Sequence, residues 1–290
     1  METKLNVKLI SNTMNPELVI ATAGKLCYSP SNIEALMEKQ TPEDTARFVN
    51  MLASMGHESP LEHVSFSFAV EGVSRSLTHQ LVRHRIASYS QQSQRYVREG
   101  QFEYVIPEDI KKHESLKVIY LEHMKDTQRT YDNLVDGLMC LYTCDEVEFS
   151  EYLSIQLSKL GIDELEFRTY IKEMGESDFT VEKFLNDLKD RYKRLYSVLE
   201  KKAIENARYV LPNAAETKII VTMNLRTLIN FCNHRCCRRA QEEINQLAWK
   251  MVEEVEKVSP LLAKNLGATC QFGACKEGKM CCMQPYPKKK

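Results

Sequence analysis

The chain has 290 residues, 43% of them hydrophobic, which is enough to bury a sizeable core. Its 39 Lys and Arg residues nearly balance its 40 Asp and Glu residues, so the formal net charge is −1. This composition argues against intrinsic disorder, and it lacks the broad positive field that an RNA-binding module requires.

No stretch of the sequence approaches the roughly 18 apolar residues of a membrane span, and the first ten residues lack the apolar core of a signal peptide. We therefore expect a cytoplasmic protein without membrane contact. In that compartment the ten cysteines are expected to be reduced thiols rather than a disulfide framework.

The first third of the chain alternates between strand and helix patterns. Residues 4–10 have a strand-like pattern, and residues 32–37 and 44–55 have helical patterns. Apolar and polar residues alternate over 63–73, which predicts a half-buried strand, and helical spacing resumes over 73–81. From Ser88 onward the sequence becomes polar without helical period, which predicts a loop.

The rest of the chain is expected to be mainly helical. Long amphipathic helices are predicted over 114–138 and 180–209, and an apolar stripe predicts one further helix over 224–257. The segment at about 140–180 between the first two helices is rich in Asp and Glu. We interpret it as a helical insertion in the main domain.

We expect residues 1–265 to form a single domain, followed by an irregular Cys-rich tail over 266–290. The last four cysteines have the spacing C-x4-C-x5-C-C, which lacks the paired C-x2-C of common zinc sites. We therefore predict no metal site, and metal ligation by Cys270, Cys275, Cys281 and Cys282 is the alternative.

Residues 83–95, with the sequence RHRIASYSQQSQR, concentrate hydrogen-bond donors in a chain that is nearly neutral. They include three arginines, a histidine, three serines and three glutamines. Arginine offers a rigid fork of donors that suits phosphate or carboxylate, and Ser and Gln side chains add orienting hydrogen bonds. The segment indicates a site for a phosphorylated small molecule, and a solvated charged surface is the alternative.

The flanking residues extend this candidate site. Gln80, Arg83 and His84 fall on one helical face, because residues three and four apart are neighbours on a helix. The predicted loop is expected to turn Ser93 and Arg95 back toward them.

Two further motifs carry candidate ligands. Ser59-Pro60-Leu61-Glu62 has the pattern of a capped helix start, with Ser59 at the N-cap, and predicts a phosphate seat beside His57; a capped helix without a ligand is the alternative. In the helix predicted over 224–257, Asn224, Arg235 and Arg239 share one face, which is either solvated or turned toward an anion. Arg208 adds another candidate donor.

Four ordered blocks of the sequence resemble one family. Arg83-His84-Arg85, seven residues and then Ser93, with Arg95-Tyr96 close behind, resemble the signature of the flavin-dependent thymidylate synthases. The resemblance continues in Gly56 to His63, in Ala207 to Pro212, and in the segment from Asn224 to Gln241. It covers about two thirds of the chain.

The resemblance implies an α/β (α+β) fold in which long helices pack on an antiparallel sheet. It implies a homotetramer with active sites between subunits. It also implies conversion of dUMP to dTMP, with 5,10-methylenetetrahydrofolate as methylene donor and NADPH as reductant of bound FAD, releasing tetrahydrofolate.

Residue roles follow from motif position. The resemblance assigns FAD binding to His57, Ser59, Arg83, His84, Arg85, Gln91, Asn224, Arg226 and Asn230. It assigns dUMP binding to Gln80, Arg83, Gln91, Gln92, Ser93, Gln94, Arg95, Arg208 and Arg235. Arg235 is the predicted catalytic residue, placed to assist ionisation at N3 of uracil. Gln91 replaces the glutamate, and Arg239 the histidine, that many relatives carry.

A non-catalytic nucleotide-binding regulatory protein could use the same arginine-rich pocket, and it is the alternative function. Retention of FAD by the purified protein distinguishes the two, because only the enzyme requires a flavin.

Overall fold

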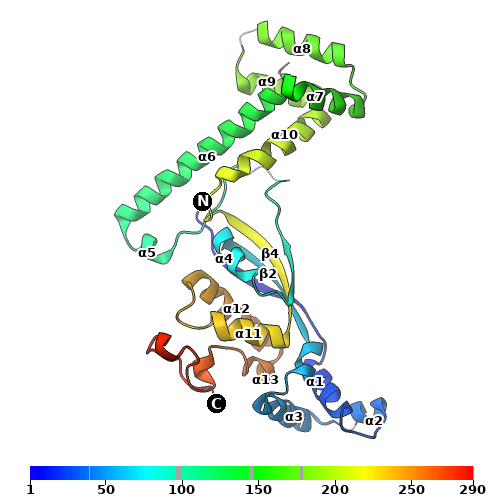
Figure 1. Cartoon of the computed structure of the whole chain (residues 1–290), viewed down its shortest axis with the longest axis vertical. Coiled ribbons are helices and arrows are strands. Elements are labelled where there is room, and N and C mark those ends of the chain that lie inside the picture. Colours follow the sequence, from blue (N-terminus) through cyan, green and yellow to red (C-terminus); the bar gives the residue numbers. More distant parts are fainter. Residues whose placement is uncertain (39, 96–99, 144–146, 177–178, 290) are drawn as a thin grey trace. The chain divides into compact units, whose positions relative to one another are not determined.

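The computed structural model describes residues 1–38, 40–95, 100–143, 147–176 and 179–289 (Figure 1). Tyr96, which belongs to the signature, lies outside the described residues. The chain forms two compact units. We call them the sheet unit, which comprises Glu2–Gln92, Glu103–Val105 and Glu216–Lys290, and the helical unit, which comprises Met1, Ser93–Phe102 and Ile106–Ala215.

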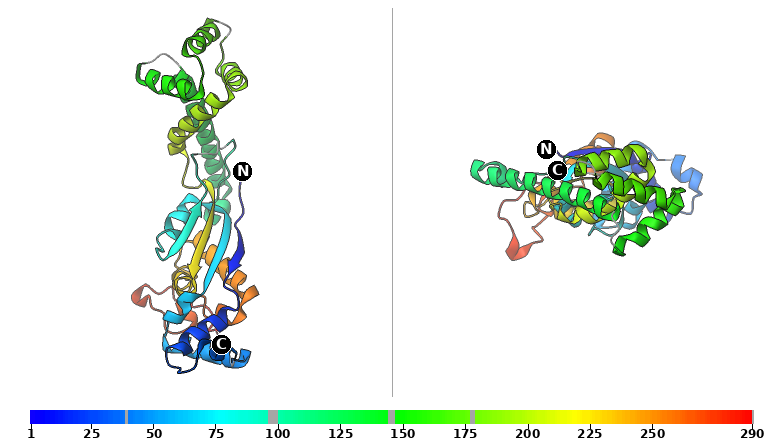
Figure 2. Two further views of the ribbon diagram at one scale, coloured as in Figure 1. Left: turned by 90° about the vertical axis from the view of Figure 1, so that its right-hand side faces the viewer. Right: turned by 90° about the horizontal axis from the view of Figure 1, so that it is seen from above.

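The sheet unit is built on four antiparallel strands, in the order β1-β2-β4-β3 (Figure 2). Their bounds are β1 Asn6–Asn12, β2 Ser65–Ser74, β3 Ala87–Gln91 and β4 Glu216–Asn224. Alternate side chains of the central strands, such as Phe66 and Phe68 of β2 and Val221 of β4, are fully buried. The predicted strands over 4–10 and 63–73 are confirmed within a few residues, since alternation on a half-buried strand is a local signal.

The strand β3 corrects the prediction of a loop after Ser88. Ser88 pairs with Thr222, and Tyr89 with Val221, along the whole length of β3. The prediction failed because this edge strand is polar, and its place in the sheet depends on backbone hydrogen bonds to β4 rather than on an apolar face.

Helices complete the core of the sheet unit. Their bounds are α1 Pro16–Leu26, α2 Ile33–Glu38, α3 Pro42–Met55, α4 Arg75–Leu81, α11 Leu225–Arg235, α12 Glu242–Val258 and α13 Pro260–Ala263, with short 3₁₀ turns η1 Ser59–His63, η3 Thr269–Gln271 and η4 Gly278–Met280. Leu228 and Phe231 of α11 and Leu247 and Met251 of α12 are fully buried in the same cluster as the inner face of the sheet. These helices therefore fix the end of β4 and the residues that follow it.

The single helix predicted over 224–257 is wrong, because α11 and α12 are separate. Asn224 ends β4 and caps α11, and the apolar stripe is interrupted between Arg235 and Glu242. The side chain of Asn245 donates to the backbone carbonyls of Arg235, at 2.8 Å, and of Cys237, at 3.1 Å. The Asn245 amide thus supplies hydrogen-bond donors to carbonyl groups at and after the end of α11, which stabilises that helix end. The apolar period of the sequence does not reveal this contact.

The helical unit contains α5 Glu108–Lys111, α6 Glu114–Thr143, α7 Val147–Leu160, α8 Glu164–Glu176, α9 Val181–Arg191, α10 Lys193–Ala207 and the 3₁₀ turn η2 Arg208–Val210. Tyr131, Leu157, Phe167 and Leu199 are fully buried in its own apolar cluster. The predicted helix over 180–209 is broken at Tyr192, whose φ of −125° and ψ of 49° are not helical. The unit extends well beyond 140–180, and its description as an insertion in one domain stays a prediction.

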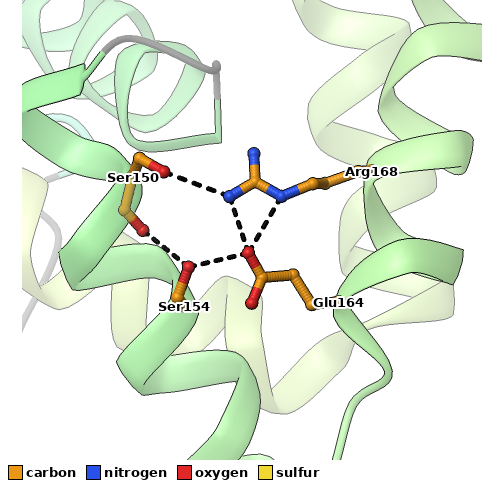
Figure 3. A network of polar contacts seen from close by, with 4 residues as sticks. All are labelled: Ser150, Ser154, Glu164 and Arg168. Carbon is orange, nitrogen blue, oxygen red and sulfur yellow. Dashed lines mark hydrogen bonds and ion pairs between the residues drawn. The ribbon is translucent and has the colours of Figure 1, made fainter.

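A polar network joins α7 to α8 within the helical unit (Figure 3). Glu164 Oε1 accepts from Arg168 Nε at 2.9 Å and from the Ser154 hydroxyl at 2.8 Å. Arg168 also donates to the Ser150 hydroxyl at 3.1 Å. In this acidic segment, the carboxylate of Glu164 is therefore paired with an arginine of the same helix.

Candidate active site

A cavity of about 660 Å³ lies in the sheet unit, and two segments distant in sequence line most of it. Six residues predicted to bind FAD line this cavity: Arg83, His84, Arg85, Asn224, Arg226 and Asn230. Other described lining residues were not predicted: Glu58, Glu62, Ile86, Thr227, Ile229, Asn233 and Lys276. Glu58 and Glu62 stand in the Gly56 to His63 block, whereas Lys276 has no motif that marks it.

Local structure sets the position of each wall. The Asn224 side chain accepts from the backbone N–H of Thr227 at 2.8 Å, so the residue that ends β4 also begins α11. Arg83 to Arg85 follow the end of α4, where the Tyr89 hydroxyl is within hydrogen-bond distance of the backbone oxygens of Leu81, at 2.9 Å, and His84, at 2.8 Å. Tyr89 thus ties the Arg-His-Arg turn to β3.

Arg226 bridges two carboxylates at the cavity wall. Its Nε lies 2.8 Å from Glu58 Oε2, and its terminal nitrogen Nη1 lies 2.5 Å from Glu62 Oε1. The hydrogen bond to Glu62 and the charge of Glu58 raise the pKa of Arg226. Arg226 therefore offsets two negative charges inside a cavity that otherwise carries arginines and a lysine.

Arg235, at the end of α11, joins the residues at the end of α4. Its Nε donates to His84 Nε2 at 3.2 Å, and a terminal nitrogen donates to Gln80 Oε1 at 3.5 Å. Gln80 also donates to the side chain of Gln241. Burial and the charge of Arg83 lower the pKa of Arg235, so a nearby anion would relieve the repulsion between these arginines.

Comparison with known proteins identifies the family. A family model described as "Thymidylate synthase complementing protein" matches residues 8–261. The chain is 46% identical over 286 residues to a flavin-dependent thymidylate synthase of Clostridium tetani, covering 99% of this chain and 96% of that protein. It is 37% identical over 280 residues to one of Geobacter sulfurreducens, covering 96% and 94%. The chain belongs to the flavin-dependent thymidylate synthase family.

The solved structures confirm the fold class. A UMP/dUMP methylase, PolB, from Streptomyces cacaoi, crystallised with 5-Br dUMP, matches with a TM-score of 0.59 and 18% identity, covering 91% of this chain and 96% of that chain. At this identity the likeness concerns the fold. The predicted α/β fold, family and methyltransferase enzyme class are confirmed.

The protonation state of His84 affects the charge of the cavity that it lines. Burial first, then the charges of Arg235, His234 and Arg83, lower the pKa of His84 to about 4. The ring packs edge-on against Phe231, with 5.0 Å between centroids. A neutral imidazole can accept from Arg235, so at neutral pH His84 is an uncharged member of the cavity wall.

This shift makes folding stability depend on pH. The unfolded chain protonates His84 near 6.5 and the folded chain near 4, so between these values the unfolded state binds more protons and stability falls as pH falls. Between these two pH values, we expect the free energy of unfolding of wild type to fall by about 1–2 kcal/mol more than that of His84→Gln. This figure is reduced because His84 is partly exposed to solvent. Urea unfolding of both proteins at pH 7 and pH 4 measures the difference. Equal losses would contradict it.

Three residues predicted to bind FAD do not line this cavity. His57 and Ser59 are exposed. A helical turn begins at Ser59 as predicted, but it is the short 3₁₀ helix η1, its N-cap residue is Glu58 rather than Ser59, and it has no side-chain cap. Its five residues cannot form the longer run of α-helical hydrogen bonds that the motif implied.

Gln91 is held inside the sheet unit. Its amide nitrogen donates to the hydroxyls of Thr78, at 3.0 Å, and Thr217, at 3.3 Å. A glutamate at this position would accept from those two hydroxyls rather than donate to them. The replacement therefore reverses the direction of two hydrogen bonds that link β3 to α4 and β4.

The remaining residues predicted to bind dUMP lie elsewhere in the fold. Gln92 lines a different, open cavity with Lys218. Arg95 forms an ion pair with Glu205 at 3.1 Å, and Arg208 Nε donates to the backbone oxygen of Glu205 at 3.3 Å. Both arginines belong to the helical unit, as do Ser93 and Gln94. Glu205, which no sequence motif marks, thus contacts two residues that were predicted to bind dUMP.

The Cys-rich tail is part of the sheet unit. Its four cysteines and Cys237 surround one small cavity. Cys237 and the four cysteines of the tail, Cys270, Cys275, Cys281 and Cys282, are free thiols. Over the described ranges, no group of three or more His, Cys, Asp or Glu residues is arranged to hold a metal ion. Likewise, no described helix is long and apolar enough to cross a membrane.

Proposed function

We propose that this chain converts dUMP to dTMP in a reaction that takes its methylene from 5,10-methylenetetrahydrofolate, and that the cavity of the sheet unit holds the FAD. The observation that carries the proposal is the convergence of Arg83 to Arg85 with Asn224, Arg226 and Asn230 on one cavity. These six residues were selected by motif alone, from segments more than 130 residues apart.

The cavity suits a dinucleotide in size and charge. Its volume of about 660 Å³ lies within the usual range for small-molecule sites. Its described lining includes three arginines and a lysine. It includes only two carboxylates, and both are paired with Arg226. The remaining cations, Arg83, Arg85 and Lys276, favour a diphosphate, and the side-chain amides of Asn224, Asn230 and Asn233 offer donors and acceptors to a flavin ring.

The residues around Arg235 would bind the uracil of dUMP. When bound, FAD supplies the hydride that completes the methyl group, after reduction by NADPH. Arg235 would place its positive charge near N3 of uracil and stabilise the negative charge that develops there, and His84 and Gln80 hold the guanidinium for that task. Because His84 is neutral at pH 7, it orients Arg235 without adding a competing charge.

We propose that Arg83 and the polar residues of 91–95, namely Gln91, Gln92, Ser93, Gln94 and Arg95, contribute to dUMP binding, together with Arg208. Arg95 contacts the carboxylate of Glu205 and Arg208 its backbone oxygen, and each guanidinium carries the fork of donors that suits a phosphate. FAD binding by His57, Ser59 and Gln91 stays a prediction from motif position. A homotetramer with active sites between subunits likewise stays a prediction from family membership.

Absorption spectroscopy of the purified protein tests the function. We expect an oxidised flavin spectrum that bleaches with NADPH and returns when dUMP and methylenetetrahydrofolate are added together, with dTMP as product. Omitting dUMP is the control. A protein that is colourless and takes up no added FAD would contradict the enzyme and support the regulatory alternative. Flavin that reoxidises without forming dTMP would contradict the reaction alone.

A further inference from the structure

The cavity proposed to hold FAD has a wall that lies beyond the part of the chain matched by the family model. That match ends at residue 261, whereas Lys276 lines the cavity beside Arg83, Arg85 and Arg226. Lys276 belongs to the segment Cys270–Cys282, which we call the C-terminal loop. No motif predicts a role for this loop beyond its cysteines.

The C-terminal loop is held in place on both sides of Lys276. Arg239 donates to the backbone oxygen of Met280 at 2.6 Å, and it forms an ion pair with Glu277 at 3.4 Å. At the start of the loop, the buried side chain of Gln271 accepts from the backbone N–H of Ala268 at 3.1 Å. The C-terminal loop therefore has a defined structure at the wall of the cavity.

The end of the chain holds the loop as well. Tyr286 packs against Trp249, with 5.1 Å between ring centroids, and the Arg238 guanidinium lies 4.1 Å from the centroid of its ring. Lys288 and Lys289 donate to backbone oxygens of residues that precede or belong to the loop, including Gly273 and Leu266. These contacts fix the loop against α12 and the helix break, so the backbone of Lys276 has a defined position.

The charges around Lys276 point to an anionic ligand. Its neighbour Glu277 is engaged by Arg239, and the two carboxylates of the cavity are engaged by Arg226. Lys276 thus adds a positive charge to Arg83 and Arg85 rather than neutralising a carboxylate of the wall. The described lining then carries two more cations than anions, and a diphosphate ester carries two negative charges.

We propose that Lys276 binds the diphosphate of FAD, so that the C-terminal loop completes the flavin site. The inference rests on the proposed function, in which this cavity holds FAD. A lysine suits this contact, because its flexible stem lets one ammonium group reach either phosphate as a point charge.

Titration of the apoprotein with FAD tests the inference. We expect Lys276→Ala to weaken FAD binding about tenfold at low salt, and Lys276→Arg to stay within about threefold of wild type, since both long side chains carry the charge. Lys279→Ala is the matched control, because Lys279 lies in the same loop and is exposed but does not line the cavity. It should bind FAD as wild type does.

Repeating the titrations at high salt separates an ionic contact from a structural one. We expect wild type and Lys276→Ala to converge at about 1 M salt, where the screening length falls to about 3 Å. An unchanged affinity for Lys276→Ala, an equal loss for Lys279→Ala, or a ratio independent of salt would overturn the inference. Wild type that binds no FAD would instead overturn the proposed function.

Discussion

Replacing Arg235 by alanine is expected to lower kcat/KM for dTMP formation by about two to three orders of magnitude, the usual effect of removing one donor that stabilises charge in the transition state. FAD is expected to remain bound, because Arg235 contacts His84 and Gln80 but does not line the cavity. Steady-state kinetics with dUMP, together with the flavin content of each protein, measure the two effects.

Controls separate the charge of Arg235 from its geometry. Arg235→Lys keeps a positive charge but loses the fork that reaches His84 and Gln80 at once, so we expect an intermediate rate. Arg47→Ala makes the same chemical change at an exposed arginine of α3 that pairs with Asp44, and it should leave the rate unchanged. An Arg235→Ala enzyme with full activity would rule out Arg235 as the catalytic cation.

Replacing Arg226 by alanine is expected to weaken FAD binding by about 10- to 100-fold, because it leaves Glu58 and Glu62 uncompensated in the cavity proposed to hold the diphosphate. The loss should be largest at low salt, where repulsion between these carboxylates and the ligand is least screened. Flavin fluorescence titration of the apoprotein measures it.

Removing the charges of Glu58 and Glu62 should restore FAD binding to Arg226→Ala. In Arg226→Ala, the further changes Glu58→Gln and Glu62→Gln remove both negative charges and keep the side-chain size, so much of the FAD affinity should return. If the triple variant binds FAD no better than the single variant, Arg226 acts by touching the ligand and the charge argument fails. Circular dichroism of each protein shows whether its overall secondary structure is retained.

Sequence alone determined many of the residues that line the cavity proposed to hold FAD. Arg83-His84-Arg85 and Asn224-Leu225-Arg226 are short motifs, and a motif keeps its spacing because neighbouring residues share one turn or helix. The strands β1 and β2 were also predictable. Their side chains alternate between a less exposed and a more exposed face, which is a local pattern with a period of two.

Tertiary structure decided the features that depend on a partner elsewhere in the chain. The strand β3 exists because β4 pairs with it, and the helix break after Arg235 is satisfied by Asn245, ten residues away. The carboxylates of Glu58 and Glu62 meet Arg226 only when η1 packs against α11. No period or spacing in the sequence encodes these distances.

Lys276 is the clearest example of a residue whose place in the cavity only the tertiary structure determines. Its own sequence, an irregular Gly- and Cys-rich stretch, predicts no element and no ligand. It reaches the cavity because Arg239, Gln271 and Tyr286 hold the C-terminal loop against the rest of the sheet unit. The sequence therefore determined the residue types that carry the chemistry, whereas packing between distant segments decided which of them share one cavity, since burial and hydrogen bonding act through space rather than along the chain.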